Sequence, residues 1–178
     1  MATYAPEFLD VVENLDTKDW QGRAWRHMFN NYTPDRVNTN GARWNPPGVG
    51  AIYTSFDRAT ALAEGQHAVD VQPRRTPARR VLYEIRVTGA DLIDLTVPGA
   101  MHAVGVDFET DVQGDNWSAC QLVGGAAAWL GRGGLIVPSA RAPGKNLVIL
   151  VGAAAGPDND LTILSRETVQ SHPHVSPG

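Results

Sequence analysis

The stretch 41–64, GARWNPPGVGAIYTSFDRATALAE, packs three kinds of local structure into a short piece of chain. A Pro-Pro-Gly turn follows GARWN, the apolar run at 50–54 predicts a short buried strand, and residues 55–70 predict a helix with Ser55 as its N-cap. The polar side chains of this stretch that could serve chemistry are Arg43, Asn45, Tyr53, Ser55 and Glu64. If the strand and the helix fold against each other, several of these side chains meet in one cleft.

The composition predicts one domain that spans residues 1–178 and buries a core without disulfides or a metal. A net charge of -4 gives no basic face for a nucleic-acid backbone, so direct nucleic-acid binding is not expected. Cys120 is the single cysteine, and no secretory leader pattern opens the chain, which favours a cytoplasmic protein. No apolar run approaches the roughly 20 residues that span a bilayer, so no membrane association is expected.

The remaining chain alternates between helix and strand patterns. Residues 5–15 predict an amphipathic helix and residues 24–29 a strand interrupted by Arg26 and His27. Asp115 is the expected cap of a helix at 115–131 that stops at Gly131. The other expected segments are a loop at 30–41, a basic connector at 71–80, strands at 80–88, 91–95, 135–139, 146–151 and 161–165, a long surface loop at 96–114, and a mobile tail at 171–178. The pattern predicts an α+β fold, a single domain of mixed β-sheets with flanking helices.

Several familiar sites are absent from the sequence. The nearest approach to a dinucleotide-binding GxGxxG motif, at 48–53, has Tyr53 in place of the third glycine. No Walker A loop and no HExxH helix occur, Ser139 lacks the GxSxG context of a hydrolase nucleophile, and no spacing of histidines and cysteines suggests a metal site.

Arg43, Tyr53, Glu64 and Ser139 together suit a phosphorylated nucleoside ligand. An arginine offers a planar fork to phosphate oxygens, a tyrosine offers a face to a flat ring, and a carboxylate holds ribose hydroxyls or stabilises an oxocarbenium-like centre. Each residue also has an ordinary structural interpretation: a loop-bracing arginine, a core tyrosine, a solvated helix glutamate, and a serine that bonds local backbone at a strand end. Arg26, which could join the set, could equally pair with Glu84.

The motifs GARWN, GAIYTS and ATALAE, followed much later by WLGRGGLIVPSARAPGKNLVI, resemble the RES domain, which is named for its Arg, Glu and Ser. The resemblance covers about residues 24–151. It implies a fold similar to the ADP-ribosyltransferase toxins and a toxin that degrades NAD by cleaving the nicotinamide–ribose bond, by hydrolysis or phosphorolysis. An ADP-ribosyltransferase acting on a protein is the alternative, and a non-catalytic nucleotide-binding module is a third.

Carried over by motif, the resemblance implies catalytic roles for Arg43, Tyr53, Glu64 and Ser139. Arg43, Tyr53, Ser139, Asn45 and Arg26 are the implied NAD-binding residues, with Arg23 as a competitor for Arg26. NAD is then a consumed substrate, and no cofactor or metal is expected. The implied partner is a cognate helix-turn-helix (Xre-like) antitoxin that covers the active site, and the resemblance also allows a homodimer within the toxin–antitoxin complex.

Overall fold

The computed structural model of the chain describes residues 3–71, 79–152 and 160–170. Its elements in chain order are α1 (Pro6–Glu13), β1 (Thr17–Phe29), β2 (Gly50–Ser55), α2 (Arg58–Asp70), β3 (Arg80–Asp94), α3 (Ala100–Ala103), the π-helical turn η1 (Phe108–Val112), α4 (Ser118–Trp129), β4 (Gly134–Pro138), β5 (Lys145–Val151) and β6 (Asp160–Val169). The predicted tail at 171–178 and most of the predicted connector at 71–80 lie outside the described residues.

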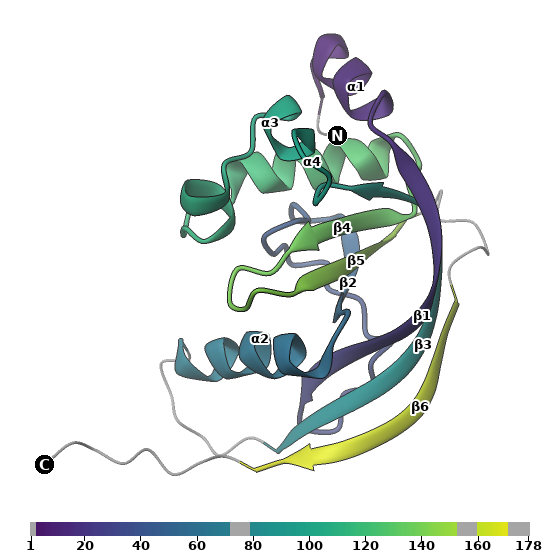
Figure 1. Ribbon diagram of the computed structural model, residues 1–178, viewed down its shortest axis with the longest axis vertical. Coiled ribbons are helices and arrows are strands. Elements are labelled where there is room, and N and C mark those ends of the chain that lie inside the picture. Colours follow the sequence, from purple (N-terminus) through teal and green to yellow (C-terminus); the bar gives the residue numbers. More distant parts are fainter. Residues whose placement is uncertain (1–2, 72–78, 153–159, 171–178) are drawn as a thin grey trace, which may run out of the picture.

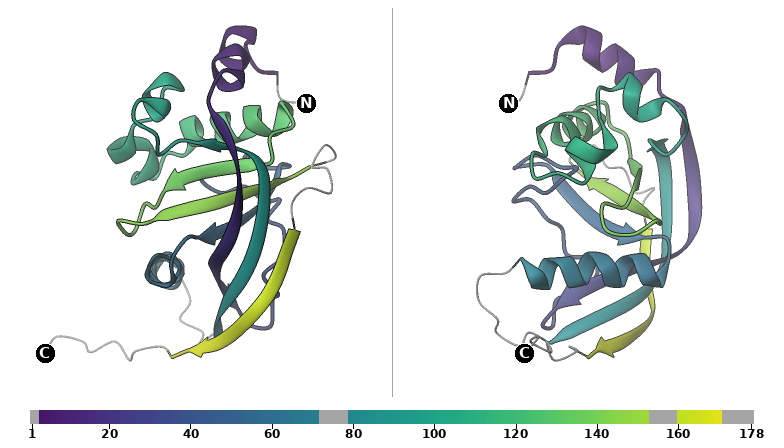
Figure 2. Two further views of the ribbon diagram at one scale, coloured as in Figure 1. Left: turned by 45° about the vertical axis from the view of Figure 1, so that its right-hand side comes forward. Right: turned by 60° about the vertical axis from the view of Figure 1, so that its left-hand side comes forward.

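The six strands form one mixed sheet in the order β1-β2-β5-β4-β3-β6, and β1 also pairs with β3. The β3–β4 pair is parallel, while the other strand pairs are antiparallel. The long strands β1, β3 and β6 curve side by side along one side of the molecule (Figures 1 and 2). The shorter strands β2, β5 and β4 lie between α4 and α2 (Figure 1), which confirms the predicted α+β class.

The central strands are buried on both faces, which explains their unbroken apolar runs. Along β5, Val148 and Leu150 belong to the cluster that also contains Val123 of α4. The alternate residues Leu147 and Ile149 belong to a second cluster, formed mainly with β1 and β3. Because successive side chains of a strand point to opposite faces, one run of apolar residues supplies both halves of the core.

Several strand predictions were wrong in their extent, and β6, predicted at 161–165, runs from Asp160 to Val169. β1 begins at Thr17, well before the predicted start at residue 24, and the two strands predicted at 80–88 and 91–95 are one strand, β3. The left-handed backbone of Asp91 (φ 52°) coincides with a shift in the pairing register between Lys18 and Trp20 of β1. It does not end β3, because β1 pairs with β3 on both sides of the shift and the carboxylate of Asp19 accepts a hydrogen bond from the Asp91 N–H. Tertiary pairing therefore overrides the local break in the pattern.

The helix starts also differ from the predicted ones. Ser55 ends β2, and the N-cap of α2 is Asp57, whose carboxylate accepts a hydrogen bond from the N–H of Thr60. Helix α4 begins at Ser118, so Asp115 is not its cap. Gly131 follows the end of α4 with a positive φ of 72°, as predicted. The segment 96–114 contains α3 and η1 and is not an aperiodic loop.

Candidate active site

A cavity of about 200 Å³ lies between α2, β1 and the adjoining ends of β2 and β5. Its walls combine aromatic rings, a guanidinium, a carboxylate and small residues of the helix. The lining residues are Trp25, Arg26, His27, Phe29, Tyr53, Thr54, Ser55, Ala61, Glu64, Gly65, Ala68 and Asn146. The structure thus brings four of the candidate residues to one cavity: Arg26, Tyr53, Ser55 and Glu64.

The carboxylate of Glu64 is held from one side by two strands that are distant in sequence. Ser139 Oγ donates a hydrogen bond to Glu64 Oε1 at 2.6 Å, and Asn146 Nδ2 donates to the same oxygen at 2.9 Å. Ser55 Oγ donates to Asn146 Oδ1 at 2.7 Å, which fixes the orientation of that amide. Among the described residues, no hydrogen bond reaches Glu64 Oε2. That oxygen is available to a ligand.

Ser139 orients the carboxylate and is not placed as a nucleophile. Its buried hydroxyl oxygen accepts hydrogen bonds from the backbone N–H groups of Arg141 at 3.1 Å and Ala142 at 3.2 Å. A serine hydroxyl has one hydrogen and two lone pairs, so its hydrogen is directed to Glu64. Ser139 therefore does both things at once: it bonds the local backbone at the end of a strand, and it donates a hydrogen bond to the glutamate.

Tyr53 presents its ring to the cavity because its hydroxyl is engaged elsewhere. The hydroxyl donates to Asn45 Oδ1 at 2.7 Å and accepts from the N–H of Trp44 at 2.9 Å. Burial raises the pKa of Tyr53, so the phenol is neutral. Asn45 is completely buried, and its amide nitrogen donates to the carbonyls of Asn38 and Val49. This position indicates that Asn45 holds the GARWN loop and Tyr53 in place and does not itself face a ligand.

Arg43 lies on the side of the site formed by η1 and the segment that precedes α4. Its Nη1 donates to the carbonyls of Asp111 at 3.1 Å and Gly114 at 3.0 Å, and the guanidinium carbon lies 5.2 Å from the centroid of the Trp117 ring. Burial and then the positive charge of Arg141 lower the pKa of Arg43, while the negative charge of Glu64 raises it. Arg43 is not among the residues that line the cavity.

Arg26 is the better placed of the two N-terminal arginine candidates. It lines the cavity, and its Nη1 donates to the carbonyl of Pro34 at 2.5 Å. Burial lowers the pKa of Arg26 to about 10, with the charge of Asp35 acting in the opposite direction, so the group remains charged at neutral pH. Arg23 is exposed and forms an ion pair with Glu84 at 3.0 Å. The sequence had suggested Glu84 as a possible partner of Arg26 instead.

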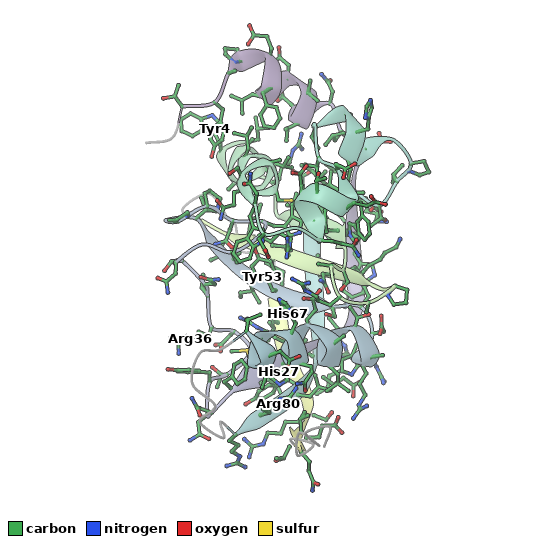
Figure 3. All side chains as sticks on the ribbon, turned by 90° about the vertical axis from the view of Figure 1, so that its left-hand side faces the viewer. Tyr4, His27, Arg36, Tyr53, His67 and Arg80 are labelled. Atoms are coloured by element: carbon green, nitrogen blue, oxygen red, sulfur yellow. The ribbon has the colours of Figure 1, made fainter. Side chains whose placement is uncertain are left out.

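His27 and Asn146 are cavity residues that sequence reasoning did not identify. His27 Nε2 accepts a hydrogen bond from Nε of the buried Arg80 at 2.9 Å, and Arg80 Nη1 donates to Gln66 at 3.0 Å. Burial and the charge of Arg80 lower the pKa of His27 to about 4, so the imidazole is neutral. A side chain at Gly65 would overlap the His27 ring. Figure 3 shows His27 and Arg80 at the level of α2, with Tyr53 on the side toward α4.

The described ranges contain no group of three His, Cys, Asp or Glu side chains that could hold a metal ion. Within the same ranges, no helix combines the length and the hydropathy needed to cross a membrane.

Comparisons with known proteins place this geometry in a family. The RES domain profile matches residues 11–169, a wider span than the motifs at 24–151. The proteins named NAD(+) phosphorylase MbcT from Mycobacterium tuberculosis and Mycobacterium bovis are 39% identical over 143 residues, which cover 73% of this chain and 75% of each relative. A crystal structure of the M. tuberculosis MbcT–MbcA toxin–antitoxin complex contains a similar chain, with a TM-score of 0.80, 28% identity and 93% of each chain covered.

The chain belongs to the RES domain family.

Proposed function

We propose that this protein is a toxin that consumes NAD by cleaving the bond between nicotinamide and ribose. The observation that carries the proposal is the carboxylate of Glu64, which is held through Oε1 by Ser139 and Asn146 at the wall of a cavity with aromatic and cationic sides. Breaking a glycosidic bond develops positive charge on the sugar, and a fixed carboxylate stabilises that charge.

Each group of residues around the cavity has its own proposed role. Oε2 of Glu64 accepts a hydrogen bond from a ribose hydroxyl and faces the developing cation. The rings of Tyr53 and Trp25 pack against the nicotinamide, and Arg26 holds the pyrophosphate. At about 200 Å³, the cavity is smaller than the roughly 300–1,000 Å³ of typical small-molecule pockets, so part of NAD extends beyond it.

Inorganic phosphate is the proposed acceptor of the ADP-ribose. The support comes from the relatives named NAD(+) phosphorylase, which are 39% identical over 143 residues. Water and a protein side chain are the competing acceptors, and the assay below distinguishes all three.

A cognate antitoxin is the proposed partner, because a similar chain is found in the MbcT–MbcA toxin–antitoxin complex. We place the protein in the cytoplasm, where NAD is available, with a helix-turn-helix antitoxin covering the cavity that contains Glu64.

Release of nicotinamide from NAD tests the proposal. Purified protein, freed of any antitoxin, is incubated with NAD in phosphate-free buffer and in buffer with inorganic phosphate. We expect nicotinamide release that rises with phosphate, and a loss of about 10²–10³-fold in kcat for Glu64→Gln, which keeps the shape and removes the charge. Glu7→Gln, at an exposed position of α1, is the control and should retain full activity.

The outcomes separate the alternatives. Release that is independent of phosphate indicates hydrolysis, and label from NAD that accumulates on a protein indicates ADP-ribosyl transfer. No release under either condition, together with unchanged toxicity of the Glu64→Gln variant in cells, would mean a non-catalytic module.

A further inference from the structure

Asn146 and Ser55 lie opposite each other on two neighbouring strands. They are paired residues of the antiparallel strands β5 and β2, so their side chains extend from the same face of the sheet. Tyr53, two residues before Ser55, extends from that face as well. All three residues line the cavity, and Glu64 Oε1 accepts a hydrogen bond from Asn146 Nδ2 at 2.9 Å. The cavity wall therefore contains an amide directly beside the carboxylate of the proposed function.

The orientation of the Asn146 amide follows from its two partners. In its ionised form a carboxylate only accepts hydrogen bonds, so the amide atom that faces Glu64 is the nitrogen. The amide oxygen then faces Ser55, whose Oγ donates to Asn146 Oδ1 at 2.7 Å. Ser55 is only 4% exposed, so water has little access to this hydrogen bond. A reversed amide would turn its oxygen toward Oε1 of Glu64, and the two oxygens would repel each other.

One hydrogen of the Asn146 amide has no acceptor among the residues that the structure describes. The amide nitrogen carries two hydrogens, and the bond to Glu64 Oε1 uses one of them. The second oxygen of the same carboxylate is also open, because Ser139 and Asn146 both donate to Oε1. A free donor and a free acceptor thus lie next to each other at the cavity wall.

A hydroxyl group is the ligand group that satisfies both positions. Its hydrogen can be donated to Oε2 of Glu64, and its oxygen can accept from Asn146 Nδ2. A carbonyl only accepts and an ammonium only donates, so each of them would leave one of the two positions without a partner. The nicotinamide ribose of NAD carries hydroxyls on the two carbons that follow the one bonded to nicotinamide. The pair of positions therefore fits the sugar whose bond is cleaved in the proposed function.

We propose that Asn146 is a substrate-binding residue: its second amide hydrogen binds the oxygen of a hydroxyl on the nicotinamide ribose, and Glu64 Oε2 accepts the hydrogen of the same hydroxyl. Ser55 is a positioning residue, because it holds the amide in the orientation that this contact requires. The inference rests on the proposed NAD cleavage and adds the residue that recognises the sugar. Ser139 differs from Asn146, because it supports the same oxygen of Glu64 but is not among the residues that line the cavity.

The affinities for ADP-ribose and for ADP test the contact without any turnover. The two ligands share the adenosine and both phosphates, and only ADP-ribose has the second ribose. Calorimetric titrations give the ratio of the two Kd values for each variant. Asn146→Ala should reduce the preference for ADP-ribose over ADP by about 3–10-fold, the value of one neutral hydrogen bond, and leave the Kd of ADP within about twofold of the wild type. Ser55→Ala should reduce the same preference by a smaller factor. Asn14→Ala, at the exposed end of α1, is the matched control and should change neither Kd.

An isosteric substitution separates the contact from a structural role. Asn146→Asp keeps the shape of the side chain but replaces the donor nitrogen with an oxygen beside Glu64. Nicotinamide release from NAD should therefore be slower in Asn146→Asp than in Asn146→Ala, whereas a residue that only filled space would give the opposite order. Ser55→Ala should slow the wild type but add nothing to Asn146→Ala, in which no amide is left to orient. Asn14→Asp, with the same change of charge, should keep the wild-type rate.

The results separate this inference from the proposed function. A reduced preference for ADP-ribose in Asn146→Ala, in a protein that releases no nicotinamide from NAD, supports the ribose contact and refutes only the cleavage. An unchanged preference in Asn146→Ala overturns the contact even if NAD is cleaved, and so does a wild type that binds ADP-ribose no more tightly than ADP. Far-UV circular dichroism checks the folding of each variant. If the Asn146 variants do not fold, the preference of Ser55→Ala decides: a reduction supports the contact, and the wild-type ratio refutes it.

Discussion

Replacing Ser139 with alanine tests whether the rigid support of Glu64 contributes to turnover. The substitution removes the hydrogen bond of 2.6 Å to Glu64 Oε1 and leaves the Asn146 donor at 2.9 Å in place. A hydrogen bond to a charged group contributes about 1.5–3 kcal/mol. Since about 1.4 kcal/mol corresponds to a tenfold change in rate, Ser139→Ala should lower kcat/KM for nicotinamide release by about 10–100-fold.

The same substitution has a separate effect on stability. It leaves the N–H groups of Arg141 and Ala142 without their acceptor, but both residues are only partly buried and water can replace the hydroxyl. The free energy of unfolding, measured in urea, should therefore fall by only about 1 kcal/mol. A variant that is folded at assay temperature but slow separates positioning from unfolding.

The assay compares wild type, Ser139→Ala, Glu64→Gln and the double variant. Because Ser139 acts through Glu64, the double variant should be no slower than Glu64→Gln alone. Ser165→Ala is the matched control, since Ser165 donates to Glu84 at 3.2 Å on the exposed surface. The reasoning is refuted if folded Ser139→Ala keeps the wild-type kcat/KM, or if Ser139→Ala slows Glu64→Gln by the same factor as it slows the wild type.

Two further predictions concern the groups around the cavity. The fold lowers the pKa of His27 from 6.5 to about 4, so it favours the neutral ring, and stability should fall as pH drops from 6.5 toward 4. The slope stays below about 1.4 kcal/mol per pH unit because a single imidazole takes up at most one proton on unfolding. Urea unfolding at several pH values checks this. His27→Gln should lose the pH dependence of the free energy of unfolding, and substitution of the exposed His102 by Gln should keep it. Equal pH profiles for the two variants would contradict the assignment of this dependence to His27. Tyr53→Phe removes the hydroxyl that donates to Asn45 and accepts from the backbone N–H of Trp44, so it should lower the free energy of unfolding by about 1–3 kcal/mol. Tyr32 is 47% exposed, so Tyr32→Phe should change the free energy of unfolding by less than about 0.5 kcal/mol. An equal effect of the two tyrosine substitutions would show that the buried hydroxyl contributes nothing.

Several elements were predictable because their signals are local. The apolar runs at 135–139 and 146–151 predicted β4 and β5, and Gly131 marked the end of α4. Local signals failed where pairing decides the outcome. β3 continues past Asp91 because β1 pairs with it on both sides. Ser55 is not the cap of α2 because it pairs with Asn146 of β5, which leaves Asp57 as the cap. The segment 96–114 packs as α3 and η1 because Val104, Val106 and Val112 are buried against α4, although they follow no regular period.

The sequence by itself determined the family, the order of the motifs and the residue types of the candidate site, because these are properties of short segments. Only the tertiary structure decided which groups act together. Ser139 and Asn146 meet Glu64 from 75 and 82 residues away because β4 pairs with β5 and β5 with β2, and no spacing in the chain expresses that register. The direction of each side chain likewise placed Arg26 in the cavity and Arg43 on the carbonyls of Asp111 and Gly114, because it depends on the face of the strand or loop from which the side chain extends.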